Sequence, residues 1–307
     1  MELFKTPKFN YIKYHKIFFG VSVVLALLSV SALLYRGKSI FSIDFTGGTL
    51  IQGYFEKQAI PLGDVRTALS AGGFVGADLQ SVPEHNAMIL RFKTQQSDAD
   101  RRDVEEKLKT VFASGFPDNP FVFERVEFVG PVVGRSLLGK ALMAIFFSFF
   151  GIVLYVAFRF KNWIWGFAGV FALVHDVFLA TGFMAITGRE ISITVIAALL
   201  TLAGFSINDT IVIFDRIREN IRLRGRSNKE TLEELINRSC NETLSRTIIT
   251  SATVFLVLTC LLSFGGEVLR DFSLALTFGV VVGSYSTIFI ATPMVFLWQM
   301  RRTKSLR

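Results

Sequence analysis

Six long runs of apolar residues constrain this chain more than any other feature of its sequence. Each run is almost free of charge and about 18 or more residues long, which is the length that an α-helix needs to cross the hydrocarbon core of a bilayer. We therefore expect six membrane spans. They are Ile17–Tyr35, Leu137–Phe158, Trp163–Thr187, Ile191–Phe214, Thr247–Ser263 and Phe272–Met300.

The composition agrees with a membrane protein. The chain has 307 residues, of which 51% are hydrophobic, and a formal net charge of +8. A soluble domain of this size could bury that much apolar surface, but here the apolar residues are concentrated in runs. The positive charge is typical of basic flanks beside membrane lipids, and the sequence contains no signature of a nucleic-acid-binding fold. We expect no nucleic-acid partner.

The distribution of Lys and Arg predicts the orientation. The N-terminal tail, the turn at Arg159, the segment 215–246 and the C-terminal tail 301–307 are rich in basic residues, whereas the opposite short loops carry only Arg189 and Arg270. Basic flanks remain in the cytoplasm, so both termini are expected there. The long segment between the first two spans is then extracytoplasmic, because long domains translocate regardless of their charge.

These features divide the chain into four parts. The first, residues 1–36, is a cytoplasmic tail with the first span. Residues 37–136 are an extracytoplasmic domain, residues 137–300 are a transmembrane bundle of five helices, and residues 301–307 are a basic cytoplasmic tail.

The segment 215–246 of this bundle is expected to be amphipathic and cytoplasmic. Its first part, up to Arg222, continues the fourth span as a helix. The sequence from Ser227 to Glu230 predicts a capping box that opens a second helix. That helix either lies on anionic lipid or docks on a cytoplasmic partner, and the sequence does not separate these alternatives.

The extracytoplasmic domain has the pattern of a mixed α+β fold. The expected elements, in order, are a strand or strand pair over Ser39–Phe55, a helix over Pro61–Ala71, strands over Asp78–Val82 and Ala87–Lys93, a helix from Ser97 to Ser114, and a strand over Phe121–Val129. This β-α-β-β-α-β order predicts a ferredoxin-like topology. His85 lies in a predicted turn without further ligand residues at metal-binding spacing, so we expect neither a metal nor a cofactor.

Asp209 lies inside the fourth predicted span. Ionisable groups are costly in hydrocarbon and usually mark function or face the interior of a bundle. The same helix carries a small, polar face suited to close packing against another helix, made of Ala197, Thr201, Gly204 and Asn208. Asp209 borders this face and is expected to look into the bundle.

Arg246 opens the fifth predicted span. Since spans four and five run in opposite directions, Arg246 and Asp209 are expected to meet at similar depth in the cytoplasmic half of the membrane. A carboxylate beside a guanidinium stays ionised, and one deprived of it is pushed toward protonation, so the pair can load and release a proton as helices move. A static ion pair, or an arginine that extends to the headgroups, remains an alternative.

His175 and Asp176 lie in the third predicted span, nearer the middle of the membrane than Asp209. A structural hydrogen bond to a neighbouring helix and a second proton station are the two alternatives, and Ser206 of the fourth span belongs to the same group of candidates. An intramembrane aspartyl protease would need Asp176 and Asp209 to share a proton at close range, which their expected depths oppose. No hydrolase motif occurs, so we expect no enzymatic activity.

Four stretches of the sequence are distinctive, and they are IDFTGGT at residues 43–49, VGPVVGRSL at 129–137, VHDV at 174–177 and GFSINDTIVIFDRIREN at 204–220. Together they resemble the SecF branch of the SecD/SecF family of bacterial protein-export membrane proteins. The resemblance covers nearly the whole chain, and the last stretch is long and specific. One departure is Phe205, where the family often has Tyr.

The resemblance implies a subunit of the bacterial plasma membrane, in a branch of the resistance-nodulation-division transporters. Such a subunit pairs with SecD, associates with the SecYEG channel and engages unfolded preproteins through its outside domain. The proton motive force drives it, without a cofactor. Asp209 and Arg246 match the family's proton-pathway positions.

Two other functions remain open at this point. One is a half-size, proton-coupled exporter of small molecules or lipids from the same superfamily. The other is a purely structural partner that only stabilises SecD.

Overall fold

The computed structural model describes residues 7–74, 77–82, 87–92, 100–160, 162–223 and 230–305. These residues form two compact units, which we treat separately. The sheet unit is Phe41–Met143, and the bundle unit consists of Met1–Ile40 together with Ala144–Arg307. His85 and Ser97, which the sequence placed in a turn and at a helix start, lie outside the described residues.

The sheet unit contains one four-stranded sheet in which every described pair of neighbours is antiparallel, in the order β2-β3-β1-β4. Its elements are β1 (Gly48–Phe55), α3 (Leu62–Ala71), β2 (Asp78–Val82), β3 (Ala87–Phe92), α4 (Asp100–Gly115) and β4 (Phe121–Val129). The expected sequence of strands and helices is therefore present, and the last strand has the predicted bounds.

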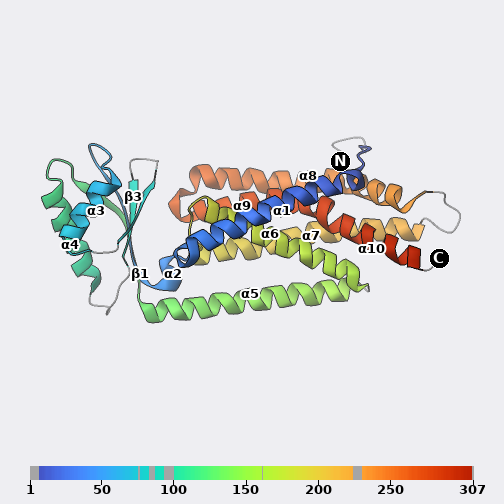
Figure 1. The fold of residues 1–307 in the computed structure, drawn as a ribbon, viewed down its shortest axis with the longest axis horizontal. Coiled ribbons are helices and arrows are strands. Elements are labelled where there is room, and N and C mark those ends of the chain that lie inside the picture. The colour runs from blue at the N-terminus through green and yellow to red at the C-terminus, as the bar shows by residue number, and fades with distance from the viewer. Residues whose placement is uncertain are drawn as a thin grey trace. The chain divides into compact units, whose positions relative to one another are not determined.

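Helices α3 and α4 cover one face of this sheet (Figure 1). Alternate residues of β1 point to that face because side chains alternate along a strand. Ile51 and Phe55 are fully buried there against Leu69 of α3 and Leu108 of α4. The opposite face of the sheet carries polar and partly buried side chains.

One expectation for this unit was wrong. The strand predicted over Ser39–Phe55 occupies only Gly48–Phe55, and it is preceded by a 3-10 turn, η1 (Gly37–Ile40), and a short helix, α2 (Ile43–Thr46). The hydroxyl of Ser42 accepts a hydrogen bond from the backbone of Asp44 and caps this helix. Gly47 then ends it with a φ of 71°, a conformation that interrupts any strand.

The structure has a long apolar helical stretch at each of the six expected spans. Six helical stretches are long and apolar enough to cross a membrane, namely Tyr11–Ile40, Pro131–Arg159, Trp163–Ile186, Ile193–Leu223, Leu232–Phe264 and Leu269–Met300. The corresponding elements are α1 (Tyr11–Arg36), α5 (Pro131–Arg159), α6 (Trp163–Ile186), α7 (Ile193–Leu223), α8 (Leu232–Phe264), and α9 (Gly266–Ser286), which continues through the π-helical turn η3 (Thr287–Ala291) into α10 (Thr292–Ser305).

Helices α6, α7 and α9 form the centre of the bundle, since they bury much more of their surface than α1, α5 or α8 (Figure 1). Glycines allow the close approaches. A Cβ on Gly279 of α9 would collide with the side chain of Leu202 on α7, and one on Gly182 of α6 would collide with Ser29 of α1. Small residues at helix crossings are typical of membrane bundles.

The segment 215–246 differs in part from its prediction. It does continue the fourth span, because α7 extends to Leu223. The second helix is not separate from the fifth span, however, since α8 runs unbroken from Leu232 to Phe264. Its capping box is made by Thr231 and Glu234, whereas Ser227, where the sequence predicted a capping box, lies outside the described residues.

Candidate functional site

Asp209 lies near the middle of α7, and its side chain is almost entirely buried, with 9% of the residue exposed. The hydroxyl of Thr247 on α8 donates a hydrogen bond to its Oδ1 at 2.8 Å. Its Oδ2 atom is buried without a hydrogen-bond partner among the residues that the structure describes. A buried polar atom without a partner is uncommon in native structures and calls for an explanation.

Arg246 does not form the expected contact with Asp209. The side chain of Arg246 is exposed, and no ion pair joins it to Asp209 in the described part of the chain. The physical reason is the rotation of α8, which turns by about 100° per residue. Thr247 faces α7 and makes the hydrogen bond to Asp209, whereas its neighbour Arg246 is exposed and acts on that carboxyl group only through its charge.

Asp176 is the most completely enclosed charge-bearing residue of the bundle's centre, with an exposure of 0%. Its Oδ2 accepts hydrogen bonds from Ser206 of α7 at 2.6 Å and from Ser286 of α9 at 2.8 Å. Its Oδ1 lies 2.9 Å from Nδ1 of the adjacent His175. The carboxyl group of α6 is therefore connected to both other central helices.

His175 extends this arrangement toward α1. The ring of Tyr285 stands edge-on to the imidazole, with centroids 6.1 Å apart, and the Tyr285 hydroxyl lies 3.0 Å from the hydroxyl of Ser22. The Nε2 atom of His175 is buried and has no hydrogen-bond partner among the described residues.

One face of α7 joins the surroundings of Asp176 to those of Asp209. Ser206, Asp209 and Thr210 recur at the i, i+3, i+4 spacing that places side chains on one face of a helix. The hydroxyl of Thr210 lies 3.1 Å from that of Thr287 on η3. We call these three residues of α7, with Asp176, Thr247, Ser286 and Thr287, the polar seam.

The two carboxyl groups of the seam are closer in depth than the sequence suggested. Asp176 is hydrogen-bonded to Ser206, which precedes Asp209 by three residues, so a rise of about 4.5 Å, slightly less than one helical turn, separates the two levels. Sequence reasoning named Ser206 but missed Thr210, Thr247, Ser286 and Thr287. Of these four residues, only Thr210 could have been found from the sequence, because helical spacing places it on the same face of the helix as Ser206 and Asp209.

The π-helical turn η3 supplies part of the seam. Ser286 contacts Asp176, and the next residue, Thr287, contacts Thr210. The backbone N–H of Thr292 donates to the carbonyl oxygen of Thr287, five residues earlier, as the wider turn requires, and the hydroxyl of Thr292 donates to the same oxygen at 2.9 Å. Single π-turns inside α-helices are frequent at functional sites.

The small, polar face predicted on α7 is open in the part of the chain that the structure describes. Ala197, Thr201, Gly204 and Asn208 are all exposed, and a Cβ on Gly204 would meet no atom within 4 Å. The prediction that this face packs against another helix is not tested by a helix of this chain among the described residues. The residues of α7 that pack inside the bundle, such as Leu202 and Ser206, lie on the opposite side of the helix.

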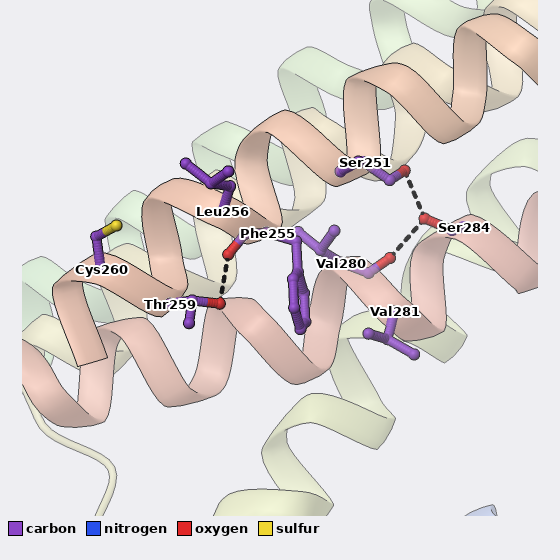
Figure 2. A pocket seen from close by; sticks show the side chains of 9 residues that line it. Ser251, Phe255, Leu256, Thr259, Cys260, Val280, Val281 and Ser284 are labelled. Atoms are coloured by element: carbon purple, nitrogen blue, oxygen red, sulfur yellow. Dashed lines mark hydrogen bonds between the residues drawn. The ribbon is translucent and has the colours of Figure 1, made fainter. Parts of the chain in front are cut away.

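A groove of about 630 Å³ lies between α8 and α9. Figure 2 shows the hydroxyls of Ser251 and Ser284 meeting across it at 2.7 Å. The rest of its lining is apolar or small and consists of Ala252, Phe255, Leu256, Thr259, Cys260, Val280 and Val281. Both helices bear exposed apolar side chains beside this groove, including Leu256 and Val281.

Ion pairs tie the ends of α7 and α8 together beyond the apolar stretch. Arg216 of α7 binds Glu242 of α8 at 2.6 Å, and the amide of Asn220 donates to the same carboxylate at 2.8 Å. Arg238 of α8 binds Glu230 at 2.9 Å. Among the described residues of the segment 215–246, Arg216 and Arg238 are therefore held in ion pairs within the chain.

Comparison with known proteins connects this arrangement to a family. The model of the family described as "Protein export membrane protein SecD/SecF, C-terminal" matches residues 109–301. The chain belongs to the SecD/SecF family. The matched residues include all of the polar seam, so Asp176, Asp209 and their hydroxyl partners lie within the region that the family model covers.

Full-length relatives carry the SecF name. The chain is 41% identical over its 307 residues to the protein translocase subunit SecF of Endomicrobium trichonymphae, covering 100% of this chain and 96% of the relative. It is 40% identical to the SecF subunits of Rickettsia typhi and Calditerrivibrio nitroreducens, covering 96% and 100% of this chain and 93% and 98% of those relatives. These names describe a transport component.

Solved SecDF structures share the fold. The crystal structure of SecDF from Thermus thermophilus, described as a translocon-associated membrane protein, matches 97% of this chain with a TM-score of 0.84 and 38% identity. A second SecDF structure matches 99% with a TM-score of 0.69. This SecF-type chain spans only 40% of each SecDF chain.

Proposed function

We propose that this chain is the SecF-type subunit of the bacterial Sec machinery and that, with a SecD partner, it uses the proton motive force to promote late-stage translocation of preproteins through the SecYEG channel. The observation that carries the energy coupling is the buried carboxyl group of Asp209, one oxygen of which has no partner among the described residues. The full-length similarity to SecF subunits supports the transport role.

Asp209 is suited to exchange a proton. A carboxylate in hydrocarbon is costly unless it is paired, and Thr247 supplies a single neutral hydrogen bond. A proton bound at Oδ2 removes the charge, and a cation brought near it favours its release. Moving one charge through a potential of 100 mV is worth about 2.3 kcal/mol, so a few protons suffice to bias a conformational change of several kcal/mol.

A SecD partner would cover polar and apolar surfaces that this chain leaves exposed. The exposed polar groups of Asn208 and Arg246 are unfavourable against lipid tails, and Asn208 belongs to a face small enough for close helix packing. The groove between α8 and α9 offers a further apolar surface. The remaining three-fifths of the solved SecDF chains is long enough to provide such a partner.

The proposed location is the bacterial plasma membrane, with both termini in the cytoplasm and the sheet unit outside. The basic flanks support this orientation. The strand order β2-β3-β1-β4 supports a ferredoxin-like domain. The face of the sheet away from α3 and α4 is the proposed contact surface for an emerging preprotein.

The experiment on Asp209 uses the complex with SecD in inverted membrane vesicles. Asp209→Asn and Arg246→Met should each abolish the stimulation of preprotein translocation by a proton gradient while the complex still assembles. Asp209→Glu should retain part of it, and Asp64→Asn, which changes an exposed carboxylate of α3, should retain all of it. Normal stimulation with both Asp209→Asn and Arg246→Met would refute the energy-coupling role and leave a structural subunit.

The preprotein contact is tested by site-specific crosslinking. A photoreactive residue at Tyr54 or Glu127, on the face of the sheet away from the helices, should crosslink to a stalled preprotein. The same residue at Arg66, on the exposed side of α3, is the matched control. Failure at every position of the open face would contradict contact through that surface.

A further inference from the structure

Asp176 connects three helices of the bundle centre through one carboxyl group. Its partners are Ser206 of α7 at 2.6 Å, Ser286 of α9 at 2.8 Å, and His175 of its own helix at 2.9 Å. Gly283 makes the approach of α9 feasible, because a Cβ there would already lie 3.5 Å from Oδ2 of Asp176. The carboxyl group is fully enclosed, and only one-tenth of the His175 side chain is exposed.

A helix clamp alone does not require these ionisable groups. Elsewhere in the same bundle, helices are joined by hydroxyl pairs without any charge, as Thr210 and Thr287 are at 3.1 Å and Ser251 and Ser284 are at 2.7 Å. Such pairs avoid the cost of burying a titratable group. The use of an aspartate beside a histidine at this position therefore indicates a role beyond packing.

Only one of the two ring nitrogens of His175 has a hydrogen-bond partner among the described residues. Its Nδ1 atom shares a hydrogen with Oδ1 of Asp176, whereas its Nε2 atom is buried and has no partner among the described residues. A network built only for stability satisfies its buried polar atoms. Nε2 is the atom at which the pair can take up a further proton.

The polar seam extends from the His175–Asp176 pair to the level of Asp209. Ser206 bonds directly to Asp176 and lies one turn from Asp209 on the same face of α7. Thr210, on that face, meets Thr287, and Thr287 follows Ser286 in the chain. Hydroxyl groups both donate and accept hydrogen bonds, so they are able to pass a proton between two titratable ends.

We propose that His175 and Asp176 form a second proton-binding site in this chain, and that Ser206 connects it with Asp209. The proposal rests on the proposed proton-coupled function and adds a second station to it. By the expected orientation, the His175–Asp176 pair is the outer station and Asp209 the inner one, one helical turn deeper toward the cytoplasm.

The proton balance at the site is simple. With one proton shared between Nδ1 and Oδ1, the pair carries one negative charge. A proton entering at Nε2 makes the pair neutral, as an imidazolium beside a carboxylate, and its departure restores the negative charge. No other reactant takes part. The titratable groups that face the pair from the packed elements are Tyr285 of α9 and, one turn along α7, Asp209.

The test measures proton flux in proteoliposomes that contain the chain with its SecD partner and a pH-sensitive dye. Asp176→Asn and His175→Gln keep the size of each side chain but remove its titration. Each should lower proton flux by about a hundredfold, the lower range for a positioned proton-transfer group, while the melting temperature stays close to that of the wild type. Ser206→Ala should lower flux without removing either titratable group.

Asn220→Ala is the structural control. It removes two hydrogen bonds between α7 and α8, to Ser239 at 2.9 Å and to Glu242 at 2.8 Å, and all three residues lie outside the polar seam. It should reduce the melting temperature and preserve flux. Wild-type flux in Asp176→Asn, or flux losses that follow the melting temperature through all four variants, would overturn the proposal in favour of a clamp.

A second readout does not depend on transport. Infrared difference spectra between high and low pH should contain a band from the protonation of the buried pair, and this band should be absent in His175→Gln and Asp176→Asn. An unchanged spectrum in both variants, or a flux that requires sodium and not protons, would contradict the assignment.

The variant Asp209→Asn separates this proposal from the one on which it rests. If Asp209→Asn abolishes flux and Asp176→Asn does not, the second site is wrong and the proposed function stands. If wild-type vesicles carry no flux, or Asp209→Asn changes nothing, the proton-coupled function itself fails.

Discussion

Thr247 on α8 donates its hydroxyl hydrogen to Oδ1 of Asp209 on α7, at 2.8 Å, within a buried part of the helix bundle. This hydrogen bond fixes one oxygen of the carboxyl group and leaves the other, Oδ2, open toward a proton. It also fixes the rotation of α8, because Thr247 and its neighbour Arg246 differ in direction by about 100° around the helix. The contact therefore orients both residues for which a role in the proton pathway is proposed.

Replacement of Thr247 by Val should impair proton-driven translocation. Valine matches the shape of threonine but has no donor for Oδ1, which leaves a buried acceptor unsatisfied at a cost of about 1–3 kcal/mol. We expect a lower melting temperature and a loss of gradient-stimulated translocation in vesicles. Thr247→Ser keeps the hydroxyl and should behave like the wild type; equal impairment by Ser and Val would show that the methyl group, and not the hydrogen bond, matters.

A pair of asparagines holds the N-terminal segment against α8. Asn241 accepts hydrogen bonds from the backbone of Phe9 and the hydroxyl of Tyr11, both at 3.2 Å, and donates to the carbonyl oxygen of Phe9 at 2.9 Å. Asn237 accepts from the backbone of Ile12 at 3.1 Å. These bonds connect the start of the first span to the helix that carries Thr247.

Asn241→Ala should destabilise the bundle by about 1–3 kcal/mol, because it removes one side of several buried hydrogen bonds at once. Thermal melting of the purified chain in detergent measures the effect. Glu233→Ala is the matched control, since the hydrogen bond between Asn10 and Glu233 is exposed, and it should change stability by no more than about 0.5 kcal/mol. Equal effects of the two substitutions would contradict the proposal that the buried hydrogen bonds of Asn241 hold the N-terminal segment against α8.

The two native cysteines report on pairing with SecD. Cys240 is completely buried, whereas Cys260 is exposed in the groove between α8 and α9. In the chain alone, a membrane-permeant thiol reagent should label Cys260 and leave Cys240 unmodified until the protein is denatured. Co-expression with SecD should slow the labelling of Cys260. Mass spectrometry of the labelled peptides gives both rates, and an unchanged rate at Cys260 would place the partner elsewhere.

The sequence determined the spans well because a membrane helix depends on the length of an apolar run, which is a local property. It also indicated the buried carboxyl groups, since Asp176 and Asp209 interrupt such runs. The rise per residue gives the depth of a residue along its helix. That estimate placed Asp176 and Asp209 in the correct order of depth but overestimated the distance between their levels.

The direction in which a side chain points from its helix was harder to predict, because it depends on which neighbours the helix packs against. Thr247 of α8, and not the expected Arg246, forms the direct contact with Asp209. The partners Ser286 and Thr287 come from a helix that follows Asp176 by more than a hundred residues, and a π-turn sets their register. The face around Gly204 was recognised as a packing surface, but the sequence did not show that this face would be exposed among the described residues.

Gly47 should tolerate no side chain, because the IDFTGGT stretch that contains it packs closely against the VGPVVGRSL stretch within the sheet unit. Gly47 adopts a φ of 71°, and a Cβ there would lie 3.1 Å from Cα of Pro131 at the start of α5. The backbone nitrogen of Gly47 in turn lies 3.1 Å from the position of a Cβ on Gly134. Both glycines are needed for the backbone of the IDFTGGT stretch to contact the VGPVVGRSL stretch.

Gly47→Ala should therefore lower stability by about 1–2 kcal/mol from backbone conformation alone, with an added steric term from the contact with Pro131. Thermal melting of the full chain measures it, and Gly63→Ala on α3, where a Cβ meets no atom within 4 Å, is the control that should leave stability unchanged or slightly raised. Because the substitution lies outside the polar seam, proton flux per folded complex should stay at the wild-type level. A loss of flux at unchanged stability would instead show that this junction takes part in coupling the outside domain to the membrane.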